Sequence, residues 1–126
     1  MSLIASILTA IVAIEHIYIL WIEMFAWETT GKKVFGNALP SDLFKPTKGL
    51  AANQGLYNGF LATGLIWSFF IDDAVWSFNI RLFFLSCVVI AALYGGITSS
   101  RSILLKQGLP AVLALIAVLL SNLISN

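Results

Sequence analysis

Three titratable side chains lie close together in an otherwise apolar stretch, IEHIYILWIE at residues 14–23: Glu15, His16 and Glu23. His16 is the only histidine of the chain. An ionisable side chain at membrane depth is costly to insert, so it usually faces protein or a water-filled cavity and marks a functional site. Imidazole and carboxyl groups can transfer protons near neutral pH, which makes His16 and Glu23 candidates for acid–base catalysis, hydrogen-bonded to each other. We expect Glu15 to contact a ligand.

Helical spacing divides these three residues between two faces. His16 and Glu23 are seven residues apart, close to two turns of an α-helix, so they share one face. The same spacing reaches back to Thr9 and Ser2, which extends a predicted polar seam to the start of the helix. Glu15 lies about 100° to the side of this seam. A metal site needs three or four converging ligands, and one histidine with two glutamates on diverging faces predicts none.

The composition limits the classes of function. Hydrophobic residues make up 60% of the 126 residues and charged residues 10%, whereas soluble domains are about half apolar and about a quarter charged. Long apolar runs are typical of integral membrane proteins. The net charge of +1 provides no basic surface for nucleic acid, so we expect the lipid bilayer rather than a nucleic acid as partner. The single cysteine, Cys87, excludes an intrachain disulfide and a CxxC motif.

Four apolar segments are long enough to cross a bilayer: residues 3–27, 50–71, 77–98 and 109–124. A span needs about 20 residues, and the absence of water in lipid forces its backbone into a helix. The first connection is long and the others are short, which favours neighbouring antiparallel helices. The sequence therefore predicts an all-α fold, an integral membrane four-helix up-and-down bundle with a long first loop, forming a single transmembrane domain over residues 1–126.

Basic residues predict how these helices cross the membrane. Six of them lie in the first and third loops: Lys32, Lys33, Lys45, Lys48, Arg101 and Lys106. The opposite side has only Arg81. Cytoplasmic loops carry an excess of Lys and Arg, so we expect loops one and three in the cytoplasm and both termini outside. We expect the membrane to be a bacterial plasma membrane, the inner membrane.

Further polar side chains are predicted at the same depth as Glu23. The second helix opens with three amides, and the third closes with a tyrosine and an arginine: Asn53, Gln54, Asn58, Tyr94 and Arg101. Gln54 and Asn58 are four residues apart and share a face. Together with Glu23, these residues predict a cytoplasm-facing polar pocket between helices one to three that binds a small amphipathic molecule. The sequence identifies no cofactor.

A different face of the second helix carries only small residues. Ala51, Gly55, Gly59 and Thr63 recur at intervals of four and include a GxxxG motif. Small residues at this spacing let a neighbouring helix approach closely within a membrane. We therefore expect a homo-oligomer that associates through the Gly55/Gly59 face.

Five phrases occur in order along the chain: EHIYILWIEMFAW, KVFG, NQGLYNGFLATGL, YGGITSS and QGLPA. Together they resemble domain-of-unknown-function family 1304, a family of small four-helix integral membrane proteins. NQGLYNGFLA is the most specific phrase, and the match covers nearly the whole chain. The resemblance implies the fold and supplies no established activity.

The layout is also similar to the MAPEG membrane enzymes, which have four helices, a long cytoplasmic first loop and polar groups opening the second helix. Tyr94 and Arg101 close the third helix, as in that family. The resemblance implies trimers that bind glutathione between subunits. The family's second helix carries Arg-Ala-x-x-Asn-x-x-Glu, whereas Gly49 and Leu56 stand at the Arg and Glu positions around Asn53. Only the architecture and the oligomerisation therefore carry over.

Three functions fit these observations. In the first, the polar pocket binds a small amphipathic molecule, with MAPEG-like catalysis as an extension. In the second, the protein is a small proton-coupled transporter with Glu15 and His16 as its mid-membrane relay. In the third, it is a structural or assembly protein whose polar seam fixes the register of the helices.

Overall fold

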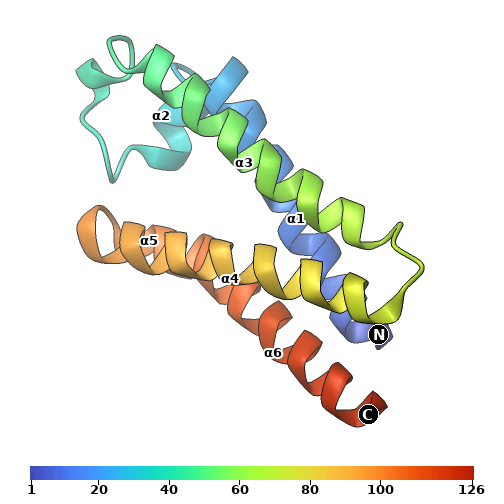
Figure 1. Ribbon diagram of the computed structural model, residues 1–126. Helices are drawn as coiled ribbons and strands as arrows, with labels where there is room; N and C mark the ends of the chain where they lie inside the picture. Colours follow the sequence, from blue (N-terminus) through green and yellow to red (C-terminus); the bar gives the residue numbers. More distant parts are fainter.

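A computed structural model describes residues 1–126, and every regular element in it is helical. Figure 1 shows the arrangement of these elements. In chain order they are α1 (Leu3–Phe25), α2 (Thr30–Phe35), the 3-10 turn η1 (Ser41–Leu43), α3 (Lys48–Ser68), α4 (Ala74–Thr98), α5 (Arg101–Ile103), the π-helical turn η2 (Leu104–Gly108) and α6 (Leu109–Ser125). The all-α prediction is confirmed.

Local sequence signals explain where the long helices begin. The Ser2 hydroxyl accepts a hydrogen bond from the Ala5 N–H, 3.2 Å away, and so caps α1. The Asp73 carboxylate accepts one from the Trp76 N–H at 3.0 Å and caps α4. Serine and aspartate are favoured at this position because their oxygens satisfy an N–H that has no partner within the helix. The third predicted helix therefore starts directly after its cap, at Ala74, three residues before residue 77.

Three helical segments are long and apolar enough to cross a membrane: Leu3–Phe25, Ala74–Thr98 and Arg101–Ser125. The chain is therefore a membrane protein by its helix composition. The second predicted span coincides with α3, which has 21 residues but carries amides in its first half. A membrane crossing by α3, and with it the up-and-down four-helix arrangement, stays a prediction.

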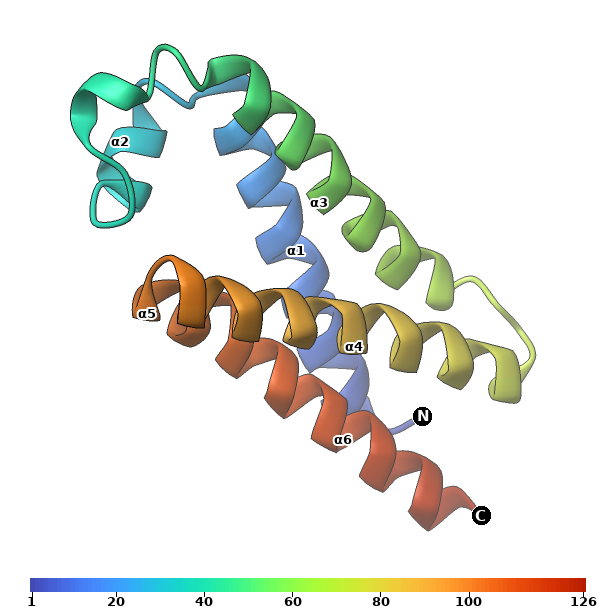
Figure 2. The ribbon, with the colours of Figure 1, turned by 60° about the vertical axis from the view of Figure 1, so that its left-hand side comes forward.

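The four long helices form four packed pairs: α1 packs against α3 and α6, and α4 packs against the same two helices. The most extensive of these contacts is between α1 and α3. Helices α3 and α4 diverge from the short connection that joins them, and α2 lies at the wide end (Figures 1 and 2). We call the end with α2, η1 and α5 the open end. The end with both termini is the closed end.

Gly55 allows the close approach of α3 to α1. A Cβ atom at this position would lie 2.8 Å from the Met24 Cγ and 3.0 Å from the Glu23 Cβ. Glycine, which has no side chain, therefore lets the two helices approach closely at their crossing. The small-residue face of α3 meets α1 of the same chain here, and self-association through the Gly55/Gly59 face stays a prediction.

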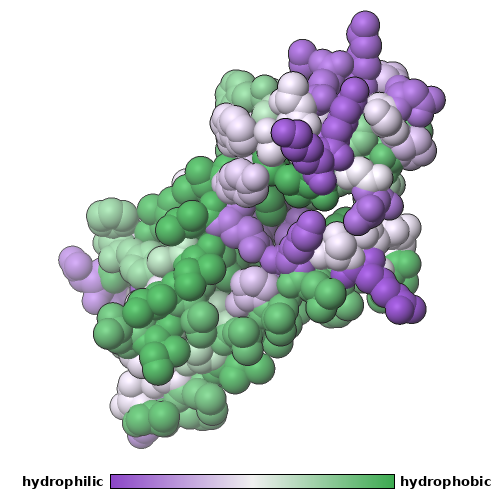
Figure 3. Space-filling model, turned by 180° about the vertical axis from the view of Figure 1, so that it is seen from behind, coloured by the Kyte–Doolittle hydropathy of each residue, from purple (hydrophilic) through white to green (hydrophobic).

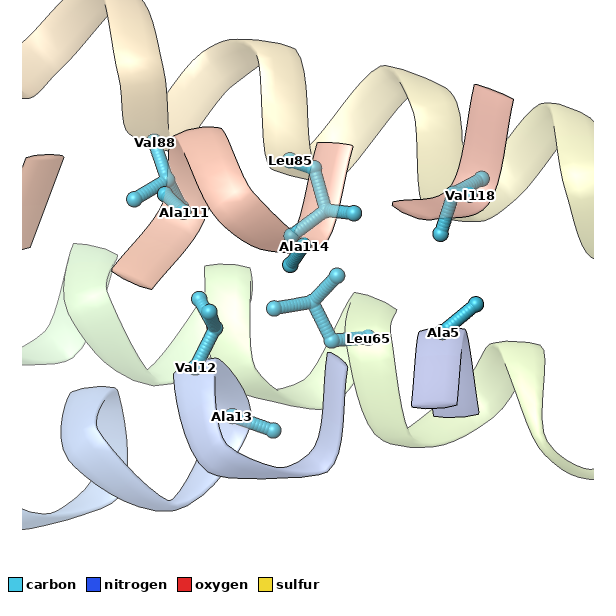
Figure 4. Packing of buried hydrophobic residues seen from close by; sticks show 9 residues of the cluster. All are labelled: Ala5, Val12, Ala13, Leu65, Leu85, Val88, Ala111, Ala114 and Val118. Atoms are coloured by element: carbon cyan, nitrogen blue, oxygen red, sulfur yellow. The ribbon is translucent and has the colours of Figure 1, made fainter. Parts of the chain in front are cut away.

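The hydrophobic core lies towards the closed end. Figure 4 shows its nine buried residues, which come from all four long helices: Ala5, Val12, Ala13, Leu65, Leu85, Val88, Ala111, Ala114 and Val118. On α1, α3 and α4 these residues lie on the closed side of His16, Asn58 and Tyr94, respectively. The core therefore closes one half of the molecule and leaves the other half for the site.

The outer surface is divided in a similar way. Large apolar side chains are exposed along the long helices, among them Leu3, Ile97 and Ile124. Figure 3 shows that hydrophilic side chains gather at one end of the molecule and that the rest of this face is mainly hydrophobic. Such an apolar belt is typical of a surface that contacts lipid.

Candidate functional site

A cavity of about 450 Å³ lies in the open half. Its walls come from α1, α3, α4, the end of the third connection and the first loop, which contributes Phe35, Leu39 and Thr47. Its polar lining residues are His16, Glu23, Thr47, Gln54, Asn58, Ser99 and Gln107. Ten of its 18 lining residues are hydrophobic. Ligand pockets are commonly built in this way, with apolar walls and a few polar groups.

Glu23 is the carboxylate of this cavity. Its side chain is 8% exposed, and its Oε1 accepts a hydrogen bond from the Asn58 Nδ2 at 2.5 Å. The close crossing at Gly55 brings these two residues of α1 and α3 together. No protein group bonds to the second carboxylate oxygen, Oε2, and the lining contains no Lys or Arg. Glu23 thus offers a free acceptor to the cavity.

His16 is the most deeply buried polar residue of the lining, at 1% exposure. Its Nδ1 lies 2.8 Å from the Val12 carbonyl oxygen, one turn earlier in α1. A carbonyl oxygen can only accept, so Nδ1 carries the proton and the neutral ring has a lone pair on Nε2. Nε2 has no protein partner. The imidazole therefore also presents an unsatisfied acceptor.

The structure divides the predicted site residues into two groups. His16, Glu23, Gln54 and Asn58 line the cavity. Four others do not: Glu15, Asn53, Tyr94 and Arg101. Tyr94 is 71% exposed, and Arg101 borders a separate hollow with Leu104 and Leu105.

The expected hydrogen bond between His16 and Glu23 is absent. Each side chain has another partner, the Val12 carbonyl for the imidazole and the Asn58 amide for the carboxylate. The reason is the helical rise, because two turns separate their backbones by about 10 Å. Both residues nevertheless line the same cavity, so a ligand of sufficient length can reach both.

The rest of the predicted seam does not belong to the cavity. Thr9 is buried and donates its hydroxyl hydrogen to the Ala5 carbonyl at 2.7 Å. Ser2 caps α1, and its backbone N–H donates to the Ser121 hydroxyl at 2.7 Å, which joins the two ends of the chain. These two residues have structural partners within the closed half.

Glu15 lies beside the seam, as its spacing predicts. Its Oε1 is buried and has no hydrogen-bond partner. It does not line the cavity. The structure brings no group of three or more His, Cys, Asp or Glu side chains together as a metal site would require.

Sequence reasoning missed the first loop as part of the site. The Trp27 Nε1 donates to the Thr47 hydroxyl at 3.0 Å, and this contact ties the start of the loop to its end. The Trp27 ring lies 4.8 Å from the ring of the buried Phe44. Both Trp27 and Thr47 line the cavity. The aromatic residues spaced along this loop could have predicted that it packs against the helices, since apolar residues in a connection need a surface to cover.

Gln107 was also missed. It lies in the π-helical turn η2, where the Leu109 N–H bonds to the Leu104 carbonyl five residues earlier. Pro110 follows, and a proline lacks the N–H that would continue the i to i−4 pattern at residue 106. Such wide turns are frequent at functional sites. The QGLPA phrase was therefore the available signal for this wall of the cavity.

Arg81 is buried in the structure, although the sequence analysis counted it as the one basic residue on the side opposite the first and third loops. It is 4% exposed inside the closed half. Its guanidinium donates to the hydroxyls of Ser68 and Ser6, both at 3.1 Å, and lies 4.2 Å from the centre of the Phe69 ring. This arginine is part of the packing, so it does not count as a basic loop residue at the closed end.

Comparison with known proteins identifies the family. The family model described as "Protein of unknown function (DUF1304)" matches residues 10–119. The chain is also similar to the uncharacterized protein YpaA of Lactococcus lactis subsp. lactis (strain IL1403), with 36% identity over 118 residues that cover 93% of this chain and 98% of the relative. No solved structure matches the chain, and the similarity to MAPEG enzymes stays a prediction. The chain belongs to the DUF1304 family of proteins of unknown function.

Proposed function

We propose that this protein is a four-helix integral membrane protein that binds a small amphipathic molecule in the cavity of its open half. One observation carries the proposal. Two side chains that are more than nine-tenths buried, His16 and Glu23, each present an acceptor atom without a protein partner to the same cavity. Neither atom is enclosed by protein, because the only buried side-chain oxygen or nitrogen without a partner is the Oε1 of Glu15. Both atoms are therefore open to a ligand in the cavity.

The mixed lining supports an amphipathic ligand. Apolar side chains such as Ile19, Leu50 and Leu61 make up more than half of the wall. The backbones of His16 and Glu23 lie two helical turns, about 10 Å, apart, so an elongated ligand is favoured over a compact one if it contacts both side chains. In a catalytic version of this function, the Nε2 lone pair of His16 would act as a general base.

Charge distribution supports an orientation in the membrane. All six basic residues of the first and third loops belong to the open end, and Arg81 is buried within the closed half. The positive-inside rule then has no counter-example in a loop, and we infer that the cavity faces the cytoplasm while both termini lie outside. Cysteines placed at Lys45 and Asp72 in a Cys87→Ser background test this. An impermeant maleimide should label only the Asp72 position in intact cells, and labelling of the Lys45 position alone would reverse the orientation.

The structure gives less support to the two other functions. The apolar core lies between the cavity and the polar residues of the closed end, so no polar route continues across the molecule for a proton or solute. A purely structural role accounts for the hydrogen bond between Glu23 and Asn58. It does not account for the unsatisfied Nε2 of His16 on a cavity wall.

Thermal unfolding in detergent tests the binding function. A ligand present at 100 times its Kd stabilises the folded state by about 2.7 kcal/mol, which raises the midpoint of unfolding by several degrees. Neutral, cationic and anionic phenylalkyl compounds are suitable probes. We expect at least one of these classes to raise the midpoint.

Two tryptophan variants locate the binding. Ala91 lines the cavity from α4 without bonding to any other residue there, so Ala91→Trp should fill the cavity and remove the shift. Ala74→Trp, at the other end of the same helix, should keep it. A shift that is equal in both variants, or no shift with any probe, would contradict the proposed function.

A further inference from the structure

The charges of the cavity restrict the class of ligand, if the proposed function holds. Glu23 is the only carboxylate in the lining, and no Lys or Arg is present there. The single ion pair of the protein, between Lys48 and Glu28 at 3.7 Å, lies outside the lining. Glu23 is thus a buried acidic group without a basic partner from the chain.

The polar groups of His16, Glu23 and Asn58 face the cavity as acceptors, whereas Gln54, Ser99 and Gln107 can both donate and accept. The Glu23 carboxylate can only accept, so the Asn58 amide must direct its NH₂ group towards it, which leaves the Asn58 carbonyl oxygen as a further acceptor. The Nε2 of His16 is an acceptor because Nδ1 is the donor to Val12. Three acceptor atoms from α1 and α3 therefore have no protein donor: the Nε2 of His16, the Oε2 of Glu23 and the side-chain carbonyl oxygen of Asn58.

We propose that the cavity binds an amphipathic amine, with an ammonium head group bonded to the Oε2 of Glu23 and an apolar tail along the hydrophobic wall. An ammonium group has three donors and no acceptor, so it can bond to the Glu23 carboxylate and to the Asn58 carbonyl oxygen beside it. It also supplies the counter-charge that Glu23 lacks. Trp27 adds an aromatic side chain to the lining, and aromatic faces attract organic cations.

Anionic ligands fit this cavity poorly. A carboxylate or thiolate head group would meet the carboxylate of Glu23 and find no guanidinium or ammonium group in the wall. The basic residues of the open end lie in the loops, and salt screens charges in water over about 8–10 Å. The cavity therefore lacks the basic partner that a glutathione-like anion needs.

Three probes with one carbon skeleton test the inference: 3-phenylpropylamine, 3-phenylpropan-1-ol and 3-phenylpropanoate. Isothermal titration at pH 7.5, with the full chain in nanodiscs of zwitterionic lipid, measures each Kd. We expect the amine to bind at least tenfold more tightly than the alcohol, and the carboxylate to bind most weakly. Empty nanodiscs give the contribution of lipid partitioning.

Matched glutamine variants assign the preference to one carboxylate. Glu23→Gln keeps an acceptor for Asn58 and should reduce the amine to the affinity of the alcohol. Glu28→Gln removes a carboxylate outside the lining at the same end and should keep the preference. Circular dichroism and the unfolding midpoint show that each variant is folded.

The outcomes separate this inference from the proposed function. Equal binding of all three probes, tighter binding of the carboxylate, or an amine preference that survives Glu23→Gln would each overturn the amine assignment and leave the cavity as a binding site. No binding of any probe, in the wild type and in Ala91→Trp alike, would overturn both.

Discussion

A single methyl group added at Gly55 tests the helix crossing that builds the site. In Gly55→Ala the new Cβ would lie 2.8 Å from the Met24 Cγ, 3.0 Å from the Glu23 Cβ and 3.2 Å from the Leu20 carbonyl oxygen. The methionine side chain can move aside. The Leu20 carbonyl belongs to the backbone of α1, so the two helices must separate. Gly49, on the same helix, has nothing within 4 Å of such a Cβ and supplies the matched control.

The two variants should differ in sign. Replacing glycine by alanine in a helix favours folding by about 0.5–1 kcal/mol, and Gly49→Ala should show this gain alone. Overpacking a close contact costs about 1–3 kcal/mol. Gly55→Ala therefore has a net effect between about zero and 2.5 kcal/mol of destabilisation, and it should be about 1–3 kcal/mol less stable than Gly49→Ala.

Reversible unfolding in mixed micelles, followed by far-ultraviolet circular dichroism, measures both free energies of unfolding. Gly55→Ala should also weaken ligand binding, because the crossing holds Glu23 against Asn58. Equal stability of the two variants, or a more stable Gly55→Ala, would refute the reasoning. It would mean that α1 and α3 do not cross at this glycine.

Three further substitutions should lower the free energy of unfolding in the same assay. Asn58→Leu leaves the Glu23 carboxylate without a partner and should cost about 1–3 kcal/mol. Ser68→Ala removes one of the two hydroxyl acceptors of the buried Arg81 guanidinium and should cost a similar amount, about 1–3 kcal/mol. Trp27→Phe loses the hydrogen bond that ties the first loop together and should cost about 1 kcal/mol.

Each of these variants has a control of the same residue type without a side-chain hydrogen bond. The controls are Asn53→Leu, Ser86→Ala and Trp67→Phe, and each should change the free energy of unfolding by less than about 0.5 kcal/mol. Any control that costs as much as its partner would show that the residue type, rather than the particular contact, sets the stability.

Periodicity predicted the part of the site that lies on one helix face. His16 and Glu23 share a face because of their spacing alone, and the same holds for Gln54 and Asn58. These four residues line the cavity. The helices themselves were predictable from apolar length, with caps at Ser2 and elsewhere refining where they begin.

The remaining lining residues could not be predicted from the periodicity of a single helix, because they depend on how the helices pack against one another. Ala91, Gly95 and Ser99 face the cavity from the end of α4, and Tyr94 lies about 100° from Gly95 on a helix. The rotation of α4 against its neighbours decides between them. The sequence predicts that Tyr94 and Arg101 close the third helix together, but α4 ends at Thr98, so Arg101 lies outside that helix.

The location of a bound ligand tests the central claim most directly. A diazirine derivative of 3-phenylpropylamine, photolysed with the protein in nanodiscs and followed by peptide mass spectrometry, reports that location. The account predicts label in both segments 16–27 and 50–61, displaced by excess unlabelled amine and lost in Ala91→Trp. Label confined to lipid-facing residues such as Ile97 and Ile124, which are 84% and 85% exposed, and unaffected by competitor would contradict it.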